Sequence, residues 1–595
     1  MDAAQDSAGS AAHAASPPSP TGSLTTAGHD ASAGPDPRSQ AIAALTAADQ
    51  PYALAEQEHR GQRIRVFVHA PQSLRALFES TASDLPFLCY QNERLTFAQT
   101  WAAASRIGHL LVHRYGVQKG DRVAIGMRNY PEWVLAFTAI TAVGGVAVAL
   151  NAHWQADELA YGLADSGARV LFADSERLAR LVHLPGTIQC QILGVRSERY
   201  NDGVLSLSAL TEALGDVPMP SVEIAPDDAA TILYTSGSTG HPKGVVSTQR
   251  NIISALLSWE LDRLVAERVA GIEPVVPIEQ PGTLLAVPLF HVSGLHASYL
   301  ASYRLQRRMV CMYRWDPEQA ARLIDQERLT TVVAPAAMTG DLVRVAQSNQ
   351  HSLATLQYVG GGGAPRAPAQ VRQIGTSFSQ ALPGTGWGMT ETNAIGAGIG
   401  GEDYLNRPAS SGRCSQVLEL KVVDEEGHSL PPGQRGELLV RGTSVFPGYW
   451  NRPDATAQAF SGDWFRTGDV AYLDQEGFLF IVDRIKDLII RGGENIGCGQ
   501  VEAALLMHPG VHECAVYGVP DERMGEEVGA SVYGSPDLDP QELQTFLAGH
   551  LARFEIPRHI VISPAPLPRT PSGKILKREI RLAALALLGL DSNPR

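Results

Sequence analysis

Short apolar runs alternate with longer amphipathic stretches through most of the chain. The runs Phe87–Tyr90, Val123–Ile125 and Ala168–Phe172 predict strands, and the stretches Phe97–Tyr115 and Asp157–Ser166 between them predict helices. Alternating strands and helices of this size indicate doubly wound α/β layers with parallel sheets. Ligands of such folds bind beyond the carboxyl ends of the strands, so residues that follow strands are the first candidates for a site.

A shorter pattern follows residue 484. It predicts helices over Gln500–Met507 and Pro540–Ala552, and strands over Glu513–Gly518 and Glu527–Tyr533. Two strand–helix units of this size indicate a compact α+β domain. The length of 595 residues also exceeds what one hydrophobic core supports.

These patterns divide the chain into four segments. Residues 1–55 are rich in Ala, Ser, Pro, Gly and Asp, with no basic residue before Arg38, which is typical of a disordered tail and not of a signal or transit peptide. Residues 56–483 are expected to form the large domain and residues 484–580 the small one. Residues 581–595 are expected to be a C-terminal tail.

One apolar run, from Trp133 to Leu150, has 18 uncharged residues and so reaches the minimal length of a membrane span. However, Gly144 and Gly145 interrupt it, and the part that follows them resembles a strand. The run therefore predicts a buried helix that leads into a buried parallel strand.

Charge and cysteine content narrow the function classes. The formal net charge is −14, with no long basic run, which argues against nucleic-acid binding. The six cysteines are scattered, with no metal-ligand spacing. This pattern favours a reduced, cytoplasmic protein without structural zinc.

The run from Tyr234 to Gly244 reads YTSGSTGHPKG and follows an apolar strand. Hydroxyl side chains alternate with glycines, whose permissive backbone lets a loop close around one anion. Lys243 adds a point charge suited to phosphate oxygens. The candidate phosphate-binding residues are Thr235, Ser236, Gly237, Ser238, Thr239, Gly240 and Lys243.

Two other interpretations of this loop compete. The Walker loop G-x-x-x-x-G-K-[ST] matches the spacing of Gly237 and Lys243, but Pro242 stands where its second glycine belongs, and Gly244 where its Mg²⁺-binding hydroxyl belongs. A solvated Ser/Gly-rich turn remains the plain alternative.

The loop resembles the signature [ST]SG[ST]TG-x-PKG of the class I adenylate-forming enzymes, which include acyl- and aryl-CoA ligases, peptide-synthetase adenylation domains and beetle luciferases. Further motifs follow in that family's order, and the resemblance extends from about Ser73 to Ile580. It implies a large domain of α/β layers with a β-barrel-like subdomain, and a small, mobile C-terminal domain. The chain is most similar to the AMP-dependent acyl-CoA synthetases within this family.

The resemblance implies roles for residues in several motifs. Gly361, Gly362, Ala364 and Pro365 would contact adenine, together with Trp387, Gly388, Met389 and Thr390. Asp469 and Arg484 would bind the ribose, and Glu391 and Thr239 would hold Mg²⁺ with the phosphates of ATP. Lys574 would be the catalytic lysine, Lys486 the hinge, and Gly492, Gly493 and Glu494 the loop that serves CoA. His291 would lie in the acid pocket.

The same resemblance indicates which residues would surround the carboxylic acid substrate. Phe290 and His291 lack the Asp that grips an amino group in peptide-synthetase domains, which argues against amino acids. The candidate pocket residues are mostly small and apolar, which favours a fatty or other apolar acid. They are Val292, Ser293, Gly294, Ala336, Ala337, Met338, Gly360 and Gly361.

The sequence also departs from the family pattern at three places. Trp387 replaces the usual Tyr, Ala336 replaces Thr, and Gly497-Cys498-Gly499 replaces the Tyr-Pro that follows the CoA loop. Cys498 has no base nearby in the sequence, so we interpret it as a structural residue.

These observations predict an ATP-dependent carboxylic acid–CoA ligase that acts through an acyl-adenylate. Its substrates would be a small carboxylic acid, ATP with Mg²⁺, and CoA. Two alternatives remain: an adenylating enzyme that loads a carrier protein, and a catalytically silent nucleotide- or acyl-binding homologue. Peripheral membrane contact and the oligomeric state stay open.

Overall fold

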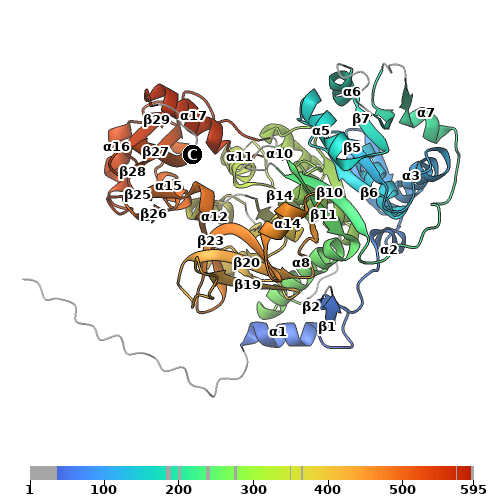
Figure 1. Cartoon of the computed structure of the whole chain (residues 1–595), viewed down its shortest axis with the longest axis horizontal. Coiled ribbons are helices and arrows are strands. Elements are labelled where there is room, and N and C mark those ends of the chain that lie inside the picture. The colour runs from blue at the N-terminus through green and yellow to red at the C-terminus, as the bar shows by residue number, and fades with distance from the viewer. Residues whose placement is uncertain are drawn as a thin grey trace, which may run out of the picture.

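The computed structural model describes residues 36–59, 61–182, 189–198, 203–235, 241–273, 278–348, 350–363, 366–378, 380–570 and 573–590. Figure 1 shows a large body and, at its upper left, a smaller one formed by the C-terminal residues. The predicted combination of a large α/β domain and a small α+β domain is confirmed.

The first sheet of the large domain has eight strands in the order β21-β11-β10-β6-β5-β7-β8-β9. Neighbours from β10 to β9 are parallel, whereas β11 and β21 add antiparallel strands at one edge. The strands are β5 (Arg122–Gly126), β6 (Val146–Ala149), β7 (Val170–Asp174), β8 (Gln191–Val195), β9 (Val204–Ser206), β10 (Ala229–Thr235), β11 (Lys243–Thr248) and β21 (Gly448–Tyr449). Helix α3 (Phe97–His109) precedes β5, and the helices α4 (Pro131–Ala142), α5 (Ala156–Ser166), α6 (Ser175–Leu181) and α7 (Leu207–Glu212) connect the strands from β5 to β10.

The second sheet has 14 strands, and the pairing of its strands changes from parallel to antiparallel at β16. On one side of β16 lie the parallel strands β15 (Tyr358–Gly361), β14 (Thr331–Val333), β12 (Gly282–Leu285), β13 (Arg308–Cys311) and β3 (Pro86–Tyr90), with β4 (Glu93–Thr96) antiparallel at the edge. On the other side the strands are antiparallel: β17 (Ala397–Gly400), β18 (Gly412–Cys414), β24 (Phe478–Arg484), β23 (Trp464–Leu473), β20 (Gly436–Gly442) and β19 (Leu418–Val423). This antiparallel half, which corresponds to the expected barrel-like part, continues the parallel half within one sheet.

Further strands and helices complete the large domain. β16 spans Leu382–Trp387 and β22 spans Phe460–Ser461. The helices are α2 (Leu74–Ser80), α8 (Gln249–Val269), α9 (Ala301–Arg304), α10 (Pro317–Gln326), α11 (Ala336–Gln347), α12 (Pro368–Ser377), α13 (Gly401–Asn406) and α14 (Pro453–Ala459).

An aromatic cluster joins the two sheets into one core. Phe87 of β3 stacks on Phe97 of α3 with ring centroids 4.4 Å apart, and both rings meet Tyr303 edge-on. Phe137 of α4 meets Tyr299 at 5.8 Å. Burying an aromatic side chain of this size contributes about 1.5–3 kcal/mol, so these contacts fix how the sheets, and the strand ends that carry the site, are oriented.

The long apolar run is a buried helix followed by a buried strand, as predicted. Every residue of β6 is buried, and α4 exposes almost none of its side chains. Gly144, at the turn between them, has a φ of 74° that favours glycine. Within the described ranges, no helix combines the length and the apolar character needed to cross a bilayer.

The small domain begins where the chain leaves the second sheet. β24 ends at Arg484, a short turn covers Ile485–Asp487, and the next strand belongs to a separate five-stranded sheet. Its strands are β25 (Ile489–Arg491), β26 (Glu494–Ile496), β27 (Val511–Asp521), β28 (Gly525–Gly534) and β29 (His559–Ile562), and its helices are α15 (Cys498–Leu505), α16 (Pro540–Leu547) and α17 (Lys577–Leu587). The sequence did not predict β29, and α16 ends before the expected Ala552.

Both predicted tails contain structure. Helix α1 (Pro37–Leu45) lies within residues 1–55, so the prediction of disorder is wrong for residues 36–55. Asp36 caps α1, and Ala41 is buried in the main core, while Figure 1 shows α1 beneath α8 and beside the hairpin of β1 (Leu54–His59) and β2 (Gln62–Phe67). The predicted C-terminal tail is also partly wrong, because α17 continues to Leu587.

Candidate functional site

A cavity of about 2940 Å³ opens between the two domains and at the carboxyl ends of the parallel strands of the second sheet. Most of the predicted site residues line it. They are Thr235, His291, Gly361, Gly362, Trp387, Gly388, Met389, Thr390, Glu391, Asp469, Arg484, Lys486 and Lys574, with the predicted pocket residues Val292, Ser293, Ala336 and Ala337.

Other predicted residues lie elsewhere. Lys243, Gly294, Met338, Gly360, Gly492, Gly493 and Glu494 are not among the residues that line the cavity. Ser236, Gly237, Ser238, Thr239, Gly240, Ala364 and Pro365 fall outside the described residues. The part of the glycine- and hydroxyl-rich loop that can be placed consists of its two ends, on β10 and β11, which pair antiparallel from Ala229 to Thr248.

Glu391 is a buried carboxylate at the cavity, on a short turn after β16. Its Oε1 accepts a hydrogen bond of 2.9 Å from the hydroxyl of Tyr449 on β21. Burial raises the pKa of Glu391, and the Tyr449 hydroxyl and the positive charges of Arg484 and Lys243 oppose that shift. Lys243 itself lies over the Tyr449 ring, 5.1 Å from its centroid.

This donor set fits Mg²⁺, which usually binds through one or two carboxylates together with phosphate oxygens and water. Glu391 offers a hard oxygen ligand at the cavity. The one cluster of three metal-ligating side chains found in the described ranges, Asp424, Glu426 and His428, lies at a surface turn between β19 and β20. A metal at the cavity would therefore depend on a substrate to complete its ligands.

Asp469 and Arg484 face each other on adjacent strands, β23 and β24. Arg484 Nε lies 2.5 Å from Asp469 Oδ1, and the indole Nε1 of Trp387 donates to Asp469 Oδ2 at 2.7 Å. Burial raises the pKa of this carboxyl group, and the Arg484 charge and the Trp387 hydrogen bond counteract it. The carboxylate is thus held on both of its oxygens.

Lys574 brings the small domain into the cavity. A turn with Gly573 at a φ of 85° projects it, and the backbone N–H of Lys574 donates to the Thr570 hydroxyl at 3.0 Å. A Cβ placed on Gly363 would lie 3.3 Å from Lys574 Cε and 3.7 Å from Nζ. The lysine therefore crosses directly over the Gly-rich turn that follows β15, where a larger residue than glycine would obstruct it.

The electrostatic surroundings of Lys574 combine both signs of charge. Desolvation in the cavity and the neighbouring Arg484 lower the pKa of Lys574, whereas Asp469 and Glu391 raise it. Basic and acidic groups from both domains thus converge on one volume, as expected for a site that handles phosphates and a carboxylate.

His291 follows β12 and lies near Phe290, with ring centroids 4.7 Å apart. Burial, and then the charges of Lys574 and His153, lower the pKa of His291 to about 4. The imidazole is therefore neutral at pH 7. It can donate or accept a hydrogen bond at the cavity wall, but it offers no positive charge to a carboxylate.

Sequence reasoning missed the wall formed by α8. Leu256, Trp259, Arg263, Ala266 and Ala270 recur every three or four residues along this segment and all face the cavity. This spacing is readable in the sequence, but it is equally typical of a helix that packs on a core. Tyr358, Leu382 and Arg307 complete this side of the cavity.

Cys498 is a structural residue in the described arrangement, as predicted. It is buried, its thiol donates to the Asp487 carbonyl at 3.1 Å, and its backbone N–H donates to Asp483 at 2.6 Å. Burial raises the pKa of the Cys498 thiol, which disfavours the nucleophilic thiolate.

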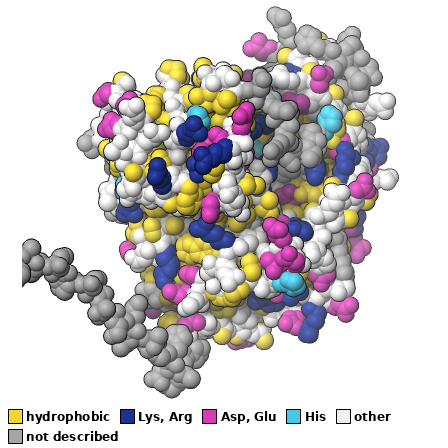
Figure 2. All heavy atoms as spheres, turned by 60° about the vertical axis from the view of Figure 1, so that its left-hand side comes forward, with side chains coloured by type: hydrophobic (Ala, Val, Ile, Leu, Met, Phe, Trp, Pro, Cys, Tyr) yellow, Lys and Arg dark blue, Asp and Glu magenta, His cyan; other side chains and the backbone are white. Residues whose placement is uncertain are grey.

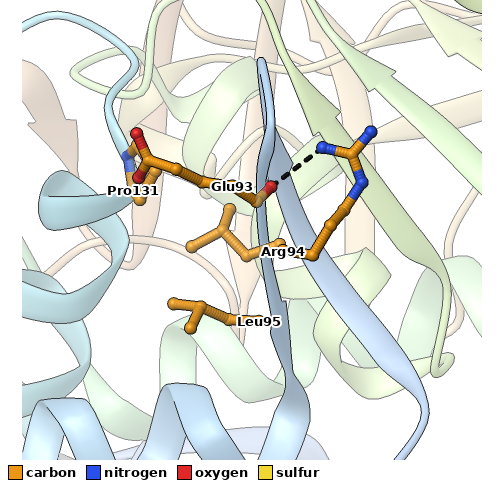
Figure 3. A pocket seen from close by; sticks show the side chains of 5 residues that line it. Glu93, Arg94, Leu95 and Pro131 are labelled. Carbon is orange, nitrogen blue, oxygen red and sulfur yellow. Dashed lines mark hydrogen bonds between the residues drawn. The ribbon is translucent and has the colours of Figure 1, made fainter.

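A second, smaller cavity of about 250 Å³ is lined by Leu88, Glu93, Arg94, Leu95 and Pro131 (Figure 3). Its charged groups are already paired, because Arg94 donates to the Glu93 carbonyl and Arg196 forms an ion pair with the Glu93 carboxylate at 2.7 Å. On the described part of the face in Figure 2, basic and acidic side chains are interspersed, which gives no continuous basic surface for a nucleic-acid backbone.

Comparisons with known proteins agree with this geometry. Residues 76–450 match the family of AMP-binding enzymes, and residues 500–574 match the C-terminal domain of AMP-binding enzymes. The chain is 33% identical to a long-chain-fatty-acid–CoA ligase of Mycobacterium tuberculosis over 82% of this chain and 93% of that protein. It is 34% identical to a feruloyl-CoA synthase of an Amycolatopsis species, again over 82% and 93%.

Solved structures show the same architecture. The o-succinylbenzoate CoA synthetase of Bacillus subtilis, in complex with its acyl-adenylate intermediate, superposes with a TM-score of 0.71 at 29% identity, over 85% of this chain and 97% of that chain. Another structure of that enzyme holds ATP and a magnesium ion, at a TM-score of 0.71, 28% identity, and 85% and 99% coverage.

Proposed function

Because the chain belongs to the family of AMP-binding enzymes, we propose that it is an ATP-dependent carboxylic acid–CoA ligase that works through an acyl-adenylate. One observation carries this proposal. Lys574 of the small domain reaches over Gly363 into a cavity that also holds Glu391, Asp469 and Arg484 of the large domain.

In the first half-reaction, a carboxylate oxygen of the acid attacks the α-phosphorus of ATP, and pyrophosphate leaves. Both reactants are anionic, so the main obstacle is charge repulsion. Lys574 would neutralise charge that develops on the α-phosphate, and the β10–β11 loop with Lys243 would orient the pyrophosphate. Mg²⁺ bound with Glu391 would supply further charge neutralisation.

In the second half-reaction, the CoA thiol loses its proton to solvent and its sulfur forms a bond to the acyl carbonyl carbon, while the C–O bond to AMP breaks and AMP leaves with that pair of electrons. Gly492, Gly493 and Glu494 would serve this step, but their hairpin lies outside the cavity while Lys574 lies inside it. We therefore assign a rotation of the small domain about Lys486, on the turn Ile485–Asp487, to the passage between the two steps.

For the acid, we propose a fatty or other apolar carboxylic acid. Among the residues that line the cavity, Val292, Ala336 and Ala337 are small and apolar, and Leu256 and Trp259 add larger apolar side chains. The relatives named above are a long-chain-fatty-acid–CoA ligase, a feruloyl-CoA synthase and an o-succinylbenzoate CoA synthetase, which supports the general reaction more strongly than any one acid. The six free cysteines fit a reducing cytoplasm.

The test is pyrophosphate release from Mg·ATP across a panel of acids, with and without CoA. The panel includes short to long fatty acids, benzoates, cinnamates, sterol acids and amino acids. Release that produces a CoA thioester for one group supports the ligase and defines its acid. Release without thioester would replace this proposal with a carrier-loading enzyme, and no release with any acid would favour a silent homologue.

A further inference from the structure

Trp387 makes a contact that its position in the sequence does not reveal. It ends β16 and is 92% buried, since only 8% of its surface is exposed. The indole N–H can only donate a hydrogen bond, so it needs an acceptor when it is buried. Here it finds the carboxylate of Asp469, 82 residues away, at 2.7 Å.

The surroundings fix the indole ring in this orientation. A Cβ on Gly396 would come within 2.3 Å of Cε3 and 2.5 Å of Cζ3 of Trp387, so only glycine at 396 leaves room for the six-membered ring. Trp387 also pairs with Ala397 in the ladder of β16 and β17, which fixes the position of the Trp387 backbone. The ring therefore has one well-defined place, with its N–H toward Asp469.

Both oxygens of the Asp469 carboxylate have a partner but keep the capacity to accept more. Arg484 forms an ion pair with Oδ1, and Trp387 donates a hydrogen bond to Oδ2. Each carboxylate oxygen has about two lone-pair sites, so, as far as the described residues show, each oxygen can accept a further hydrogen bond. Two acceptors at fixed positions in the cavity match two neighbouring hydroxyl groups, such as those of a ribose.

We propose that Trp387 is a positioning residue that orients the Asp469 carboxylate so that it accepts hydrogen bonds from both ribose hydroxyls of ATP. This inference rests on the proposed function, because it assumes that ATP binds in this cavity. It adds a role for this chain's own tryptophan: discrimination between ATP and its 2′-deoxy and 3′-deoxy analogues depends on the indole N–H and not only on the ring.

The experiment measures the dissociation constants of Mg·ATP, Mg·2′-deoxyATP and Mg·3′-deoxyATP by calorimetry, with no acid or CoA present. Replacing Trp387 by β-(3-benzothienyl)alanine exchanges the N–H for sulfur and keeps the size and stacking surface of the ring. Trp387→Phe removes the N–H with a smaller ring, and Trp387→Tyr provides a hydroxyl donor. The matched control is Trp315→Phe, because Trp315 Nε1 donates to Asp341 Oδ2 at 2.8 Å and neither residue lines the cavity.

A hydrogen bond to a charged group that is lost from a buried site typically changes binding about tenfold. We expect the benzothienyl and Phe variants to bind ATP about tenfold more weakly, while their affinity for the deoxy analogues changes little, so that the discrimination ratio collapses. Trp387→Tyr restores the ratio, and the Trp315 control leaves it unchanged.

Two results would overturn the inference while the proposed function stands. One is an unchanged ratio in the benzothienyl variant. The other is an equal loss of affinity for all three nucleotides, which would mean that the indole acts through stacking alone. If the unmodified protein binds none of the nucleotides, the proposed function falls, and this inference falls with it.

Discussion

The lysine that crosses between the domains gives the sharpest test of the mechanism. Lys574→Ala removes the ammonium that lies over Gly363, within 3.7 Å of where a Cβ would stand. One preorganised group aimed at developing charge is worth about 2.7–4 kcal/mol, or about 10²–10³ in kcat. We expect adenylation to fall by at least this factor, while thioester formation from supplied acyl-adenylate and CoA stays within about threefold.

The two half-reactions are measured separately, by ATP–pyrophosphate exchange and by thioester release from synthetic acyl-adenylate. Arg523→Ala is the control, because it removes a positive charge from an exposed position of the same small domain, outside the cavity. An equal loss in both half-reactions would refute the assignment of Lys574 to the first step alone.

The pH dependence offers a second measurement on the same residue. Desolvation and Arg484 lower the pKa of Lys574 despite the opposing charges of Asp469 and Glu391. A lowered lysine pKa means that the protonated form is lost at a lower pH than in a free lysine, so adenylation is expected to decline early on the alkaline side. Lys574→Arg, whose guanidinium stays protonated, is expected to shift this decline to higher pH. An unshifted profile would contradict the assignment.

Three further predictions concern groups around the cavity. Tyr449→Phe removes the hydrogen bond to Glu391 and is expected to raise the Mg²⁺ concentration needed for half-maximal adenylation about tenfold; an unchanged Mg²⁺ titration would refute it. Because His291 has a pKa of about 4 and is neutral at pH 7, we expect no step in the pH–rate profile of adenylation between pH 5.5 and 8 that depends on His291. His291→Gln is expected to retain more activity than His291→Leu. A step near pH 6.5 that His291→Gln abolishes would refute this prediction. Burial raises the pKa of Asp262 to about 6 despite the hydrogen bond that it accepts from Ser415. The charged carboxylate therefore destabilises the folded protein, and this cost grows as the pH rises from about 4 to 6. Asp262→Asn is expected to increase the free energy of unfolding, measured by urea denaturation, by about 1–2 kcal/mol at pH 7 and by nothing at pH 4.

Much of the fold follows from local patterns in the sequence. Ser73 caps α2, and Thr96 forms a capping box with Gln99 at the start of α3, where the hydrophobic period begins. The apolar run of α4 and β6 was recognisable because a glycine pair interrupts it. These signals act within a few residues, so they can be read without knowing what packs against them.

The errors arise where tertiary contacts decide. Helix α1 carries an ordinary start signal, Asp36 followed by Pro37, but its composition resembles that of the tail before it. Its stability comes from packing Ala41 against the main core, which the sequence cannot display. The bond between Trp387 and Asp469 joins residues 82 positions apart, and Glu391 accepts its hydrogen bond from Tyr449 of β21, over whose ring Lys243 lies.

The geometry of the small domain explains why one active site would need two arrangements of the chain. The Lys574 turn is tied to β27 through the ion pair of Arg569 and Glu513 at 2.9 Å, and the β25–β26 hairpin is tied to β28 of the same sheet. Because both are attached to one rigid sheet, they move together. The hairpin lies outside the cavity while Lys574 lies inside it, and the chain passes from the large domain to the small one through a short, exposed turn between Arg484 and Leu488. In the proposed mechanism, a rotation at that turn would let one domain serve both steps, and it would also have to release the Cys498–Asp483 contact.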